Sequence, residues 1–422
     1  MNTLNPNSAK KWTLTQKVLF RFVFIFILFR LISFPFPYNF LPDIGKYVAP
    51  LFVWLSGWCG THILHLNYSC TYLQVSDSTG MYITLLILFC FAFFGTIIWT
   101  VLDKERQSYN TLFYAFMVII RYYLATQLLI YGFDKVFKRQ FYLPEPNTLY
   151  TPIGNVPSAL LYWSTMGLSR LYTVFCGIIE VIPAFLLLFR RTALLGALMS
   201  LGVMLNVVVI NFSYDINVKL HSIFLLLLGI IIAAPHAESI FRFFMGLGAA
   251  KVNMSSPEYY SKKMFRLYAI TKIAVIAFIL SALLYPTFQT KNFNDDTAER
   301  PLLHGAYSVI TFIKNKDTIP ALTTDISRWE RVFVHRRGYF ITENMNDIMK
   351  DFSLEYDTAK HLLFVKRYND TAPNILNYTK TSDTTLLLSG KFEGDSLKVT
   401  LKKLDLNKLP ALQQGFHWTI DY

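Results

Sequence analysis

The chain contains an apolar run at residues 109–133, YNTLFYAFMVIIRYYLATQLLIYGF, with one arginine, Arg121, near its middle. Two further apolar runs follow at residues 168–189 and 192–212, and a fourth begins at about Asn217. Each is long enough to cross a bilayer, because a transmembrane helix needs about 20 apolar residues. A charge at mid-bilayer costs at least about 2.5–3.5 kcal/mol, so the polar residues set into these runs mark a candidate site.

The composition indicates a membrane protein. Only 16% of the 422 residues are charged, whereas a soluble domain has about 25%. The apolar excess lies before Pro286, and those 286 residues carry 22 Lys and Arg against 10 Asp and Glu. The net charge of +13 therefore belongs to the apolar part and indicates anchoring at a phospholipid surface. No basic face with interleaved aromatic residues is present, which argues against nucleic acid as a partner.

Seven membrane spans are predicted, at residues 18–34, 81–102, 109–133, 168–189, 192–212, 217–234 and 267–285. The stretch 38–66 contains Pro42 and Pro50, which favours an interfacial segment over a further span. With the N-terminus inside, twelve basic residues lie in inner segments and six in outer loops, as the positive-inside rule requires. The sequence thus predicts a bacterial inner membrane location, with a cytoplasmic N-terminus and a periplasmic C-terminal domain.

After Pro286 the hydrophobic pattern changes to a period of two. Leu397, Val399 and Leu401 alternate with polar residues, which is typical of a half-buried strand. Further strands are predicted at residues 304–313, 331–342, 352–356, 361–366, 385–392 and 416–421. About eight short strands are typical of a small antiparallel barrel or sandwich. An eight-stranded barrel either holds one small ligand or is filled by side chains.

The predicted fold class is therefore an α-helical polytopic membrane protein with about seven spans and a C-terminal all-β soluble domain. Four parts are predicted along the chain. They are a two-span segment with an interfacial loop (1–108), a four-helix membrane bundle (109–235), a cytoplasmic loop with the seventh span (236–286) and a periplasmic β-domain (287–422). Three basic residues lie near the span ends, from which long side chains can reach the interface, and no function is predicted for them: Arg21, Arg30 and Lys272.

Two opposite charges are predicted to meet inside the bilayer. Arg121 lies 12 residues from the outer end of its run, and Glu180 lies 12 residues from the outer start of the next. At the helical rise per residue, both lie about 18 Å below the outer surface. Each needs an opposite charge in a low dielectric, so an Arg121–Glu180 ion pair is expected. The pair is either a structural staple or the charged floor of a pocket, and the sequence leaves both open.

The other polar residues approach this pair from the outer side. Asn206 lies about 9 Å deep and His221 about 6 Å deep by the same helical rise. The mouth of the predicted pocket carries Lys135, Asn211, Asp215 and Lys219. Asparagines in membrane helices more often bond to neighbouring helices than to ligands. A lone histidine is more often a satisfied core residue, but His221 near two charged residues is a candidate for proton exchange.

Part of this region resembles a known family. Arg121, the Gly132-Phe-Asp-Lys135 segment, Glu180, the Arg190-Arg191-Thr192 turn and Met204–Asn206 are similar to the DoxX family of bacterial four-helix membrane proteins. In that family an arginine opens the first helix, Gly-x-x-Lys closes it, and a glutamate in the second helix precedes a basic turn.

The resemblance covers about residues 110–235 and implies a four-helix bundle. It also implies a role in redox reactions at the membrane, including quinone-linked sulfur oxidation and partnership with thiol or oxygen-stress enzymes. The chain differs from the family in having two predicted spans before the four-helix bundle, a seventh span after it and an outer β-domain. It also departs in having no redox-cysteine pair in the bundle.

The first loop contains the pattern C-x2-H-x2-H-x4-C, formed by Cys59, His62, His65 and Cys70. Zinc and copper take thiolate and imidazole ligands. In an oxidising compartment a Cys59–Cys70 disulfide is the simpler interpretation, and two unpaired thiols are the next. No metal site is therefore assigned.

The leading hypothesis is an inner-membrane, DoxX-like protein of a membrane oxidoreductase system. It would bind a small redox molecule or a quinone headgroup in an outward-facing polar pocket. Arg121 and Glu180 would set the charge of that pocket, and His221 would exchange protons. The binding candidates are Lys135, Asn206, Asn211, Asp215 and Lys219. The expected partners are the lipid bilayer and a periplasmic or membrane redox protein.

The alternative hypothesis is a non-enzymatic membrane anchor. Its periplasmic β-domain would then bind a protein, a lipid or an envelope component. The sequence names neither the ligand nor the direction of electron flow, and it leaves open whether the chain is an enzyme.

Overall fold

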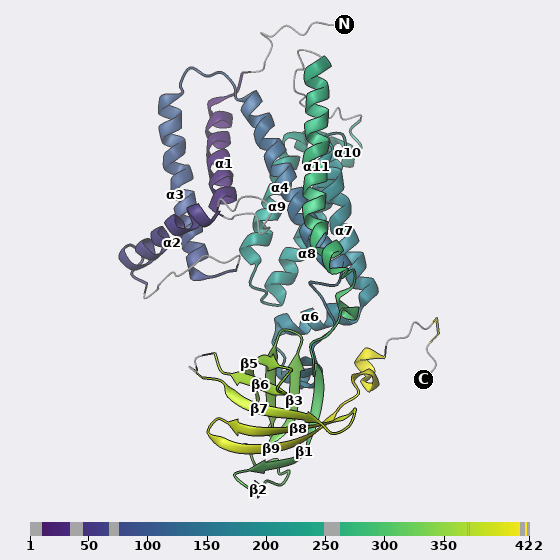
Figure 1. Ribbon diagram of the computed structural model, residues 1–422. Coiled ribbons are helices and arrows are strands. Elements are labelled where there is room, and N and C mark those ends of the chain that lie inside the picture. Colours follow the sequence, from purple (N-terminus) through teal and green to yellow (C-terminus); the bar gives the residue numbers. More distant parts are fainter. Residues whose placement is uncertain are drawn as a thin grey trace. The chain divides into compact units, whose positions relative to one another are not determined.

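The computed structural model describes residues 11–33, 45–66, 76–248, 262–368, 370, 372–413 and 418–419. The chain divides into two compact units. The helical unit comprises Met1–Phe137 and Val174–Phe293, and the barrel unit comprises Lys138–Thr173 and Asn294–Tyr422. Figure 1 shows the helices in purple to green and the strands in green to yellow. The β-domain therefore includes a segment, 138–173, that lies far before the strands in the sequence.

The helical unit is built from nine helices within the described ranges. They are α1 (Leu14–Ser33), α2 (Gly45–His62), α3 (Thr79–Leu102), α4 (Asn110–Val136), α7 (Arg170–Leu188), α8 (Ala193–Ser213), α9 (Lys219–Ala233), α10 (Ala237–Phe244) and α11 (Lys262–Thr290). The first four residues of α7 belong to the barrel unit.

Six segments in the described part of the chain are long and apolar enough to cross a membrane. They are α3, α4, α7, α8, the stretch Lys219–Phe244 that joins α9 to α10, and α11 with its extension to Thr297. These six correspond to six of the seven predicted spans. The first predicted span is also a helix, α1, but it carries three basic residues among its 20. Insertion of these helices into a bilayer stays a prediction.

Helix α4 lies at the centre of the helical unit. In its apolar stretch 56% of the residues are buried, against 17% in α3 and 6% in α11. Its fully buried Ile120, Leu124 and Leu128 share one hydrophobic core with Ile27 of α1 and Leu228 of α9. The polar residues of α4 are therefore placed where several helices can reach them.

Arg21 on α1 is buried inside the helical unit. It is 1% exposed, and its Nε donates to the Tyr109 hydroxyl at 3.0 Å. Its terminal nitrogens donate to Thr100 Oγ1 and to the Asp103 carbonyl, each at 2.9 Å. The Tyr109 hydroxyl in turn donates to the Asp103 carboxylate at 2.7 Å. The guanidinium thus donates to three different groups inside the protein, which satisfies most of its N–H donors. The cluster ties α1 to the α3–α4 connection.

The barrel unit contains nine strands in one antiparallel sheet: β1 (Gly305–Lys314), β2 (Asp317–Thr318), β3 (Trp329–His335), β4 (Tyr339–Asn344), β5 (Met349–Asp357), β6 (Leu362–Lys366), β7 (Asn374–Lys380), β8 (Thr385–Phe392) and β9 (Asp395–Lys403). From β3 to β9 each strand pairs with the next in the sequence. Strand β1 pairs with both β3 and β9, with Phe312 opposite Val399, and so closes eight strands into a barrel. Of the two predicted β architectures, the barrel is confirmed.

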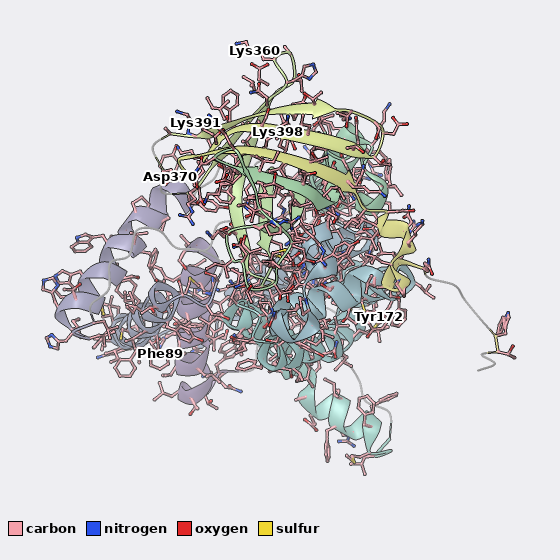
Figure 2. The ribbon with its side chains drawn as sticks, turned by 90° about the horizontal axis from the view of Figure 1, so that it is seen from below. Phe89, Tyr172, Lys360, Asp370, Lys391 and Lys398 are labelled. Carbon is pink, nitrogen blue, oxygen red and sulfur yellow. The ribbon has the colours of Figure 1, made fainter. Side chains whose placement is uncertain are left out.

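The barrel interior is filled by side chains. Trp329 lies 5.4 Å from Phe312 and 5.0 Å from Phe392 between ring centroids, and Phe392 lies 5.1 Å from Phe352. Many outward positions are polar, and Figure 2 shows Lys391 and Lys398 projecting from the outer side of β8 and β9. Of the two possibilities for an eight-stranded barrel, the aromatic filling fits a packed core.

The predicted strands agree with most of the barrel. The prediction at 385–392 matches β8, whereas the predicted run 331–342 contains two strands, β3 and β4, joined by a turn at residues 336–338. Strand β7 was missed because Asn374–Lys380 is rich in asparagine, threonine and lysine. The strand predicted at 416–421 lies almost wholly outside the described residues.

Segment 138–173 packs on the outer face of strands β1, β3 and β4. It contains α5 (Pro146–Tyr150) and α6 (Ser158–Leu168). The Tyr150 ring packs 5.9 Å from the Phe333 ring of β3, in a small core with Ala306 and Ile341. This packing explains why the segment belongs to the barrel unit.

Candidate functional site

Helix α4 presents a row of polar side chains at every fourth position. These residues are Tyr123, Gln127, Tyr131 and Lys135, and an interval of four places them on one helical face. Tyr123, Gln127 and Lys135 are each less than 10% exposed. Only Lys135 of this row is among the predicted site residues, although the spacing of the row is visible in the sequence. Buried polar side chains in such a row need hydrogen-bond partners on other helices.

The carboxylate of Glu180 on α7 is the partner of Lys135. The Lys135 ammonium donates to both Glu180 oxygens, at 2.9 and 2.7 Å, and both side chains are buried. The backbones approach closely at Gly132 and Gly177, where a Cβ on Gly132 would lie 3.0 Å from the Gly177 carbonyl oxygen. This contact places the last turn of α4 against the middle of α7, because small residues let two helices come together.

The predicted Arg121–Glu180 pair is wrong. Arg121 lies 14 residues before Lys135 on α4, about 21 Å away along the helix. Its guanidinium instead lies over the Tyr122 ring, with Cζ 5.7 Å from the centroid. The depth estimate failed because it set the outer ends of the two helices at one level. Gly132, which contacts Gly177, lies four residues before the end of α4 at Val136, whereas Gly177 lies seven residues after the start of α7 at Arg170, so the two helix ends are not level.

His221 on α9 is buried beside this pair. Its ring centroid lies 6.1 Å from that of Tyr131, and Lys135 Nζ lies 5.7 Å from the Tyr131 centroid. Only 8% of His221 is exposed, and neither ring nitrogen has a hydrogen-bond partner within the described part of the chain. Tyr131 thus connects His221 to Lys135 in one cluster.

Helix α1 adds a second cation to the cluster. Arg30 is 3% exposed, and its Cζ lies 4.9 Å from the Phe224 ring centroid, one turn of α9 after His221. It interacts electrostatically with His221 and Tyr123. No role was predicted for Arg30, because its place near the end of a helix suggested an exposed side chain. We name Arg30, Tyr131, Lys135, Glu180 and His221 the α4 cluster.

The remaining predicted binding residues do not join the α4 cluster by any described contact. Asn206 is exposed on α8, and Asn211 is buried with its Nδ2 lacking a hydrogen-bond partner among the described residues. Lys219 pairs with the exposed Asp215 at 2.7 Å. The backbone N–H groups of Lys219 and Leu220 donate to the Asp77 carboxylate, which caps α9. Asp215 and Lys219 therefore shape the start of α9.

The barrel unit contains a second buried carboxylate, Glu145, which the sequence analysis missed. Glu145 is 4% exposed, and its oxygens lie 3.1 Å from His304 Nε2 and 3.8 Å from His335 Nε2. Arg336 donates to it through its Nε and, at 3.0 Å, through its backbone N–H. Arg336 also pairs with Asp295. No motif marks these residues, because segment 138–173 and strands β1 and β3 meet only in the folded barrel unit.

The surroundings of Glu145 hold it ionised. Burial acts to raise its pKa, but the hydrogen bond from His304 and the charges of His335 and Arg336 outweigh burial and lower the pKa to about 2. Burial of the His335 ring lowers the pKa of His335, and the positive charges of Arg336 and Arg337 lower it further. We name Glu145, Asp295, His304, His335 and Arg336 the Glu145 network.

The cysteine and histidine pattern of the first loop lies partly outside the described residues. Cys59 is buried in α2, whereas Cys70 is not described, so the predicted disulfide is outside what the structure describes. His62 stacks on Trp58, with ring centroids 5.4 Å apart. Over the described ranges, no three His, Cys, Asp or Glu side chains gather closely enough to hold a metal ion.

Comparison with known proteins finds sequence similarity to one protein over a short stretch. Over 99 residues the chain is 35% identical to an uncharacterized protein of Bacillus subtilis (strain 168), YwoB. The match covers 24% of this chain and 62% of the YwoB chain, so this chain spans less than two thirds of that relative. No protein family matches the chain in a family search, and no solved structure matches it.

Proposed function

We propose that the helical unit binds a small redox molecule bearing a carbonyl on a planar ring, with a quinone headgroup as the leading example. The two ring nitrogens of His221 carry the proposal, because they are buried and lack hydrogen-bond partners among the described residues. Buried polar side-chain atoms in proteins nearly always have a partner. Two unsatisfied atoms on one ring therefore mark a place for a ligand.

The chemistry of the α4 cluster fits a quinone. A neutral imidazole offers one N–H donor and one acceptor nitrogen, and the Tyr131 hydroxyl offers a second donor. Both rings can face a planar ligand, since aromatic rings prefer offset or edge-to-face contacts. The Lys135 ammonium, held by Glu180, adds positive charge near a carbonyl oxygen. These residues would bind and orient the ring, and His221 would exchange protons with it.

The DoxX-like pattern supports the same class of ligand. Three residues that carry the resemblance, Gly132, Lys135 and Glu180, are those that bring α4 and α7 together. A bound quinone would supply the electron-accepting chemistry. The electrons would come from a partner oxidoreductase of the membrane or the outer compartment. In this proposal the chain is a quinone-binding subunit of a membrane oxidoreductase system.

The proposal is tested with the full-length protein in lipid nanodiscs. Short-chain benzoquinone and naphthoquinone are the probes, and quenching of protein fluorescence measures binding. His221→Phe keeps the ring volume and removes both nitrogens. We expect its quinone affinity to fall about tenfold or more, since a lost hydrogen bond to a buried partner costs about 1–3 kcal/mol. Its thermal unfolding should stay close to that of the wild type.

Asn206→Ala is the control, because Asn206 is exposed on α8 and makes no described contact with the α4 cluster. It should bind both quinones as the wild type does. Equal affinities for the wild type and a folded His221→Phe variant would reject the proposal.

A further inference from the structure

A separate group of cations lies along the contact between α4 and α11, away from the α4 cluster. Arg121 of α4 interacts electrostatically with Lys272 of α11 and with Arg190 in the α7–α8 turn. The two helices pack against each other. The hydroxyls of Tyr114 and Tyr268 lie 3.5 Å apart, about two turns before Arg121 on α4 and one turn before Lys272 on α11.

Arg121 and Lys272 have no acidic partner in the described part of the chain. The charged or titratable neighbours of Arg121 are three tyrosines and Arg190, and those of Lys272 are Tyr268 and Arg121 itself. The Arg121 Nε is buried and has no hydrogen-bond partner among the described residues. Arg121 and Lys272 have thus been brought together without a described negative charge between them.

The groups that do contact these cations are too weak to balance them. Arg121 lies over the Tyr122 ring, and Lys272 Nζ lies 4.8 Å from the Phe189 ring centroid. Such contacts contribute about 0.5–2 kcal/mol and leave the charge in place. The nearby end of α7, where Tyr122 reaches the Leu188 carbonyl at 3.5 Å, contributes about half a negative charge. Two half-buried cations in an apolar helix bundle need a full anion.

We propose that Arg121 and Lys272 form a binding site for a phosphate group. A guanidinium matches phosphate with two parallel hydrogen bonds, and a lysine ammonium adds a compact charge. Basic pockets between membrane helices bind anionic lipid headgroups, so the phosphate belongs to an anionic phospholipid or to a free phosphate compound. The site is independent of the quinone proposal.

The test uses delipidated full-length protein and native mass spectrometry. Phosphatidylglycerol, phosphatidylcholine and inorganic phosphate are added separately, and retained adducts and thermal stabilisation are measured. Binding of phosphatidylglycerol above phosphatidylcholine assigns the site to an anionic lipid, and stabilisation by inorganic phosphate alone assigns it to a free anion. In either case we expect Arg121→Gln and Lys272→Gln each to bind about tenfold more weakly, since hydrogen bonds to charged groups contribute about 1.5–3 kcal/mol.

Arg191→Gln is the matched control, because Arg191 is exposed in the same turn and loses the same charge. It should retain wild-type binding. Lys272→Gln keeps the test decisive if Arg121→Gln fails to fold. The proposal is overturned if no anion binds, or if Lys272→Gln and Arg191→Gln weaken binding equally.

Discussion

Two buried carboxylates, Glu145 in the barrel unit and Glu180 in the helical unit, have opposite surroundings. Glu145 meets His304, His335 and both the side chain and the backbone of Arg336. Among the described residues, Glu180 makes hydrogen bonds to Lys135 alone, and beside that pair the two His221 nitrogens have no hydrogen-bond partner. A saturated network is what a structural role requires, whereas an unsaturated one leaves capacity for a ligand. The difference predicts a structural role for Glu145 and agrees with the ligand binding that we propose for the α4 cluster.

Removing the charge of Glu145 should have the largest effect. Glu145→Gln leaves Arg336 and two histidines without their shared carboxylate, and breaking a buried ion pair costs about 3–5 kcal/mol. Hydrogen–deuterium exchange by mass spectrometry should therefore show the amides of β3 and β4 exchanging about 100-fold faster or more. Peptides of α4 provide the internal reference, since the helical unit is a separate compact unit.

The control for this variant is Glu393→Gln. Glu393 also pairs with an arginine, Arg367 at 3.5 Å, but both side chains are at least one third exposed. Exposed pairs contribute about 0–1 kcal/mol, so exchange in the barrel should change little. If Glu145→Gln behaves like this control, the Glu145 network is not structural, and the contrast with Glu180 fails.

Acid should weaken the barrel unit in two stages. The folded pKa of His335 lies below its ordinary 6.5, so the unfolded chain binds the extra proton and stability falls as the pH drops through 6.5. The pKa of Glu145 is about 2 against an ordinary 4.5, so its contribution is present above 4.5 and is lost as the pH falls toward 2. The second stage amounts to about 3 kcal/mol at most.

Denaturant unfolding of the full chain, followed by fluorescence from neutral pH to about pH 3, measures these stages. Glu145→Gln should lose the lower stage. A barrel equally stable across that range would contradict the charge assignments in the Glu145 network.

The sequence predicted the fold well where the pattern is local. Runs of about 20 apolar residues gave six of the long helices, and alternation such as Leu397, Val399 and Leu401 gave the strands. The grouping of segment 138–173 with the barrel was not predictable. It rests on contacts such as Tyr150 with Phe333, between residues far apart in the chain, which periodicity does not record.

The candidate site was predicted in part. Charged residues in apolar runs pointed to Lys135, Glu180 and His221, because membrane segments rarely hold such groups. The choice of partner for Glu180 failed, since counting residues from helix ends does not reveal where two helices cross. Arg30 and Tyr131 were missed because their importance depends on what α1 and α9 bring to α4.

The close contact of Gly132 and Gly177 gives the sharpest test of how Glu180 is positioned. A Cβ on Gly177 would lie 2.6 Å from the Gly132 carbonyl oxygen and 2.9 Å from the Val136 nitrogen, and both atoms are backbone. Gly177→Ala must therefore push α4 and α7 apart, at a cost of about 1–3 kcal/mol. Gly202→Ala in α8 is the matched control, because a Cβ there meets nothing within 4 Å and alanine favours the helix by about 1 kcal/mol.

The thermal unfolding temperature should fall in Gly177→Ala and stay unchanged or rise in Gly202→Ala. Quinone affinity should fall in Gly177→Ala alone, since the Lys135–Glu180 pair separates with the helices. Unchanged affinity in a destabilised Gly177→Ala would show that the pair is a staple like Glu145, with no part in binding.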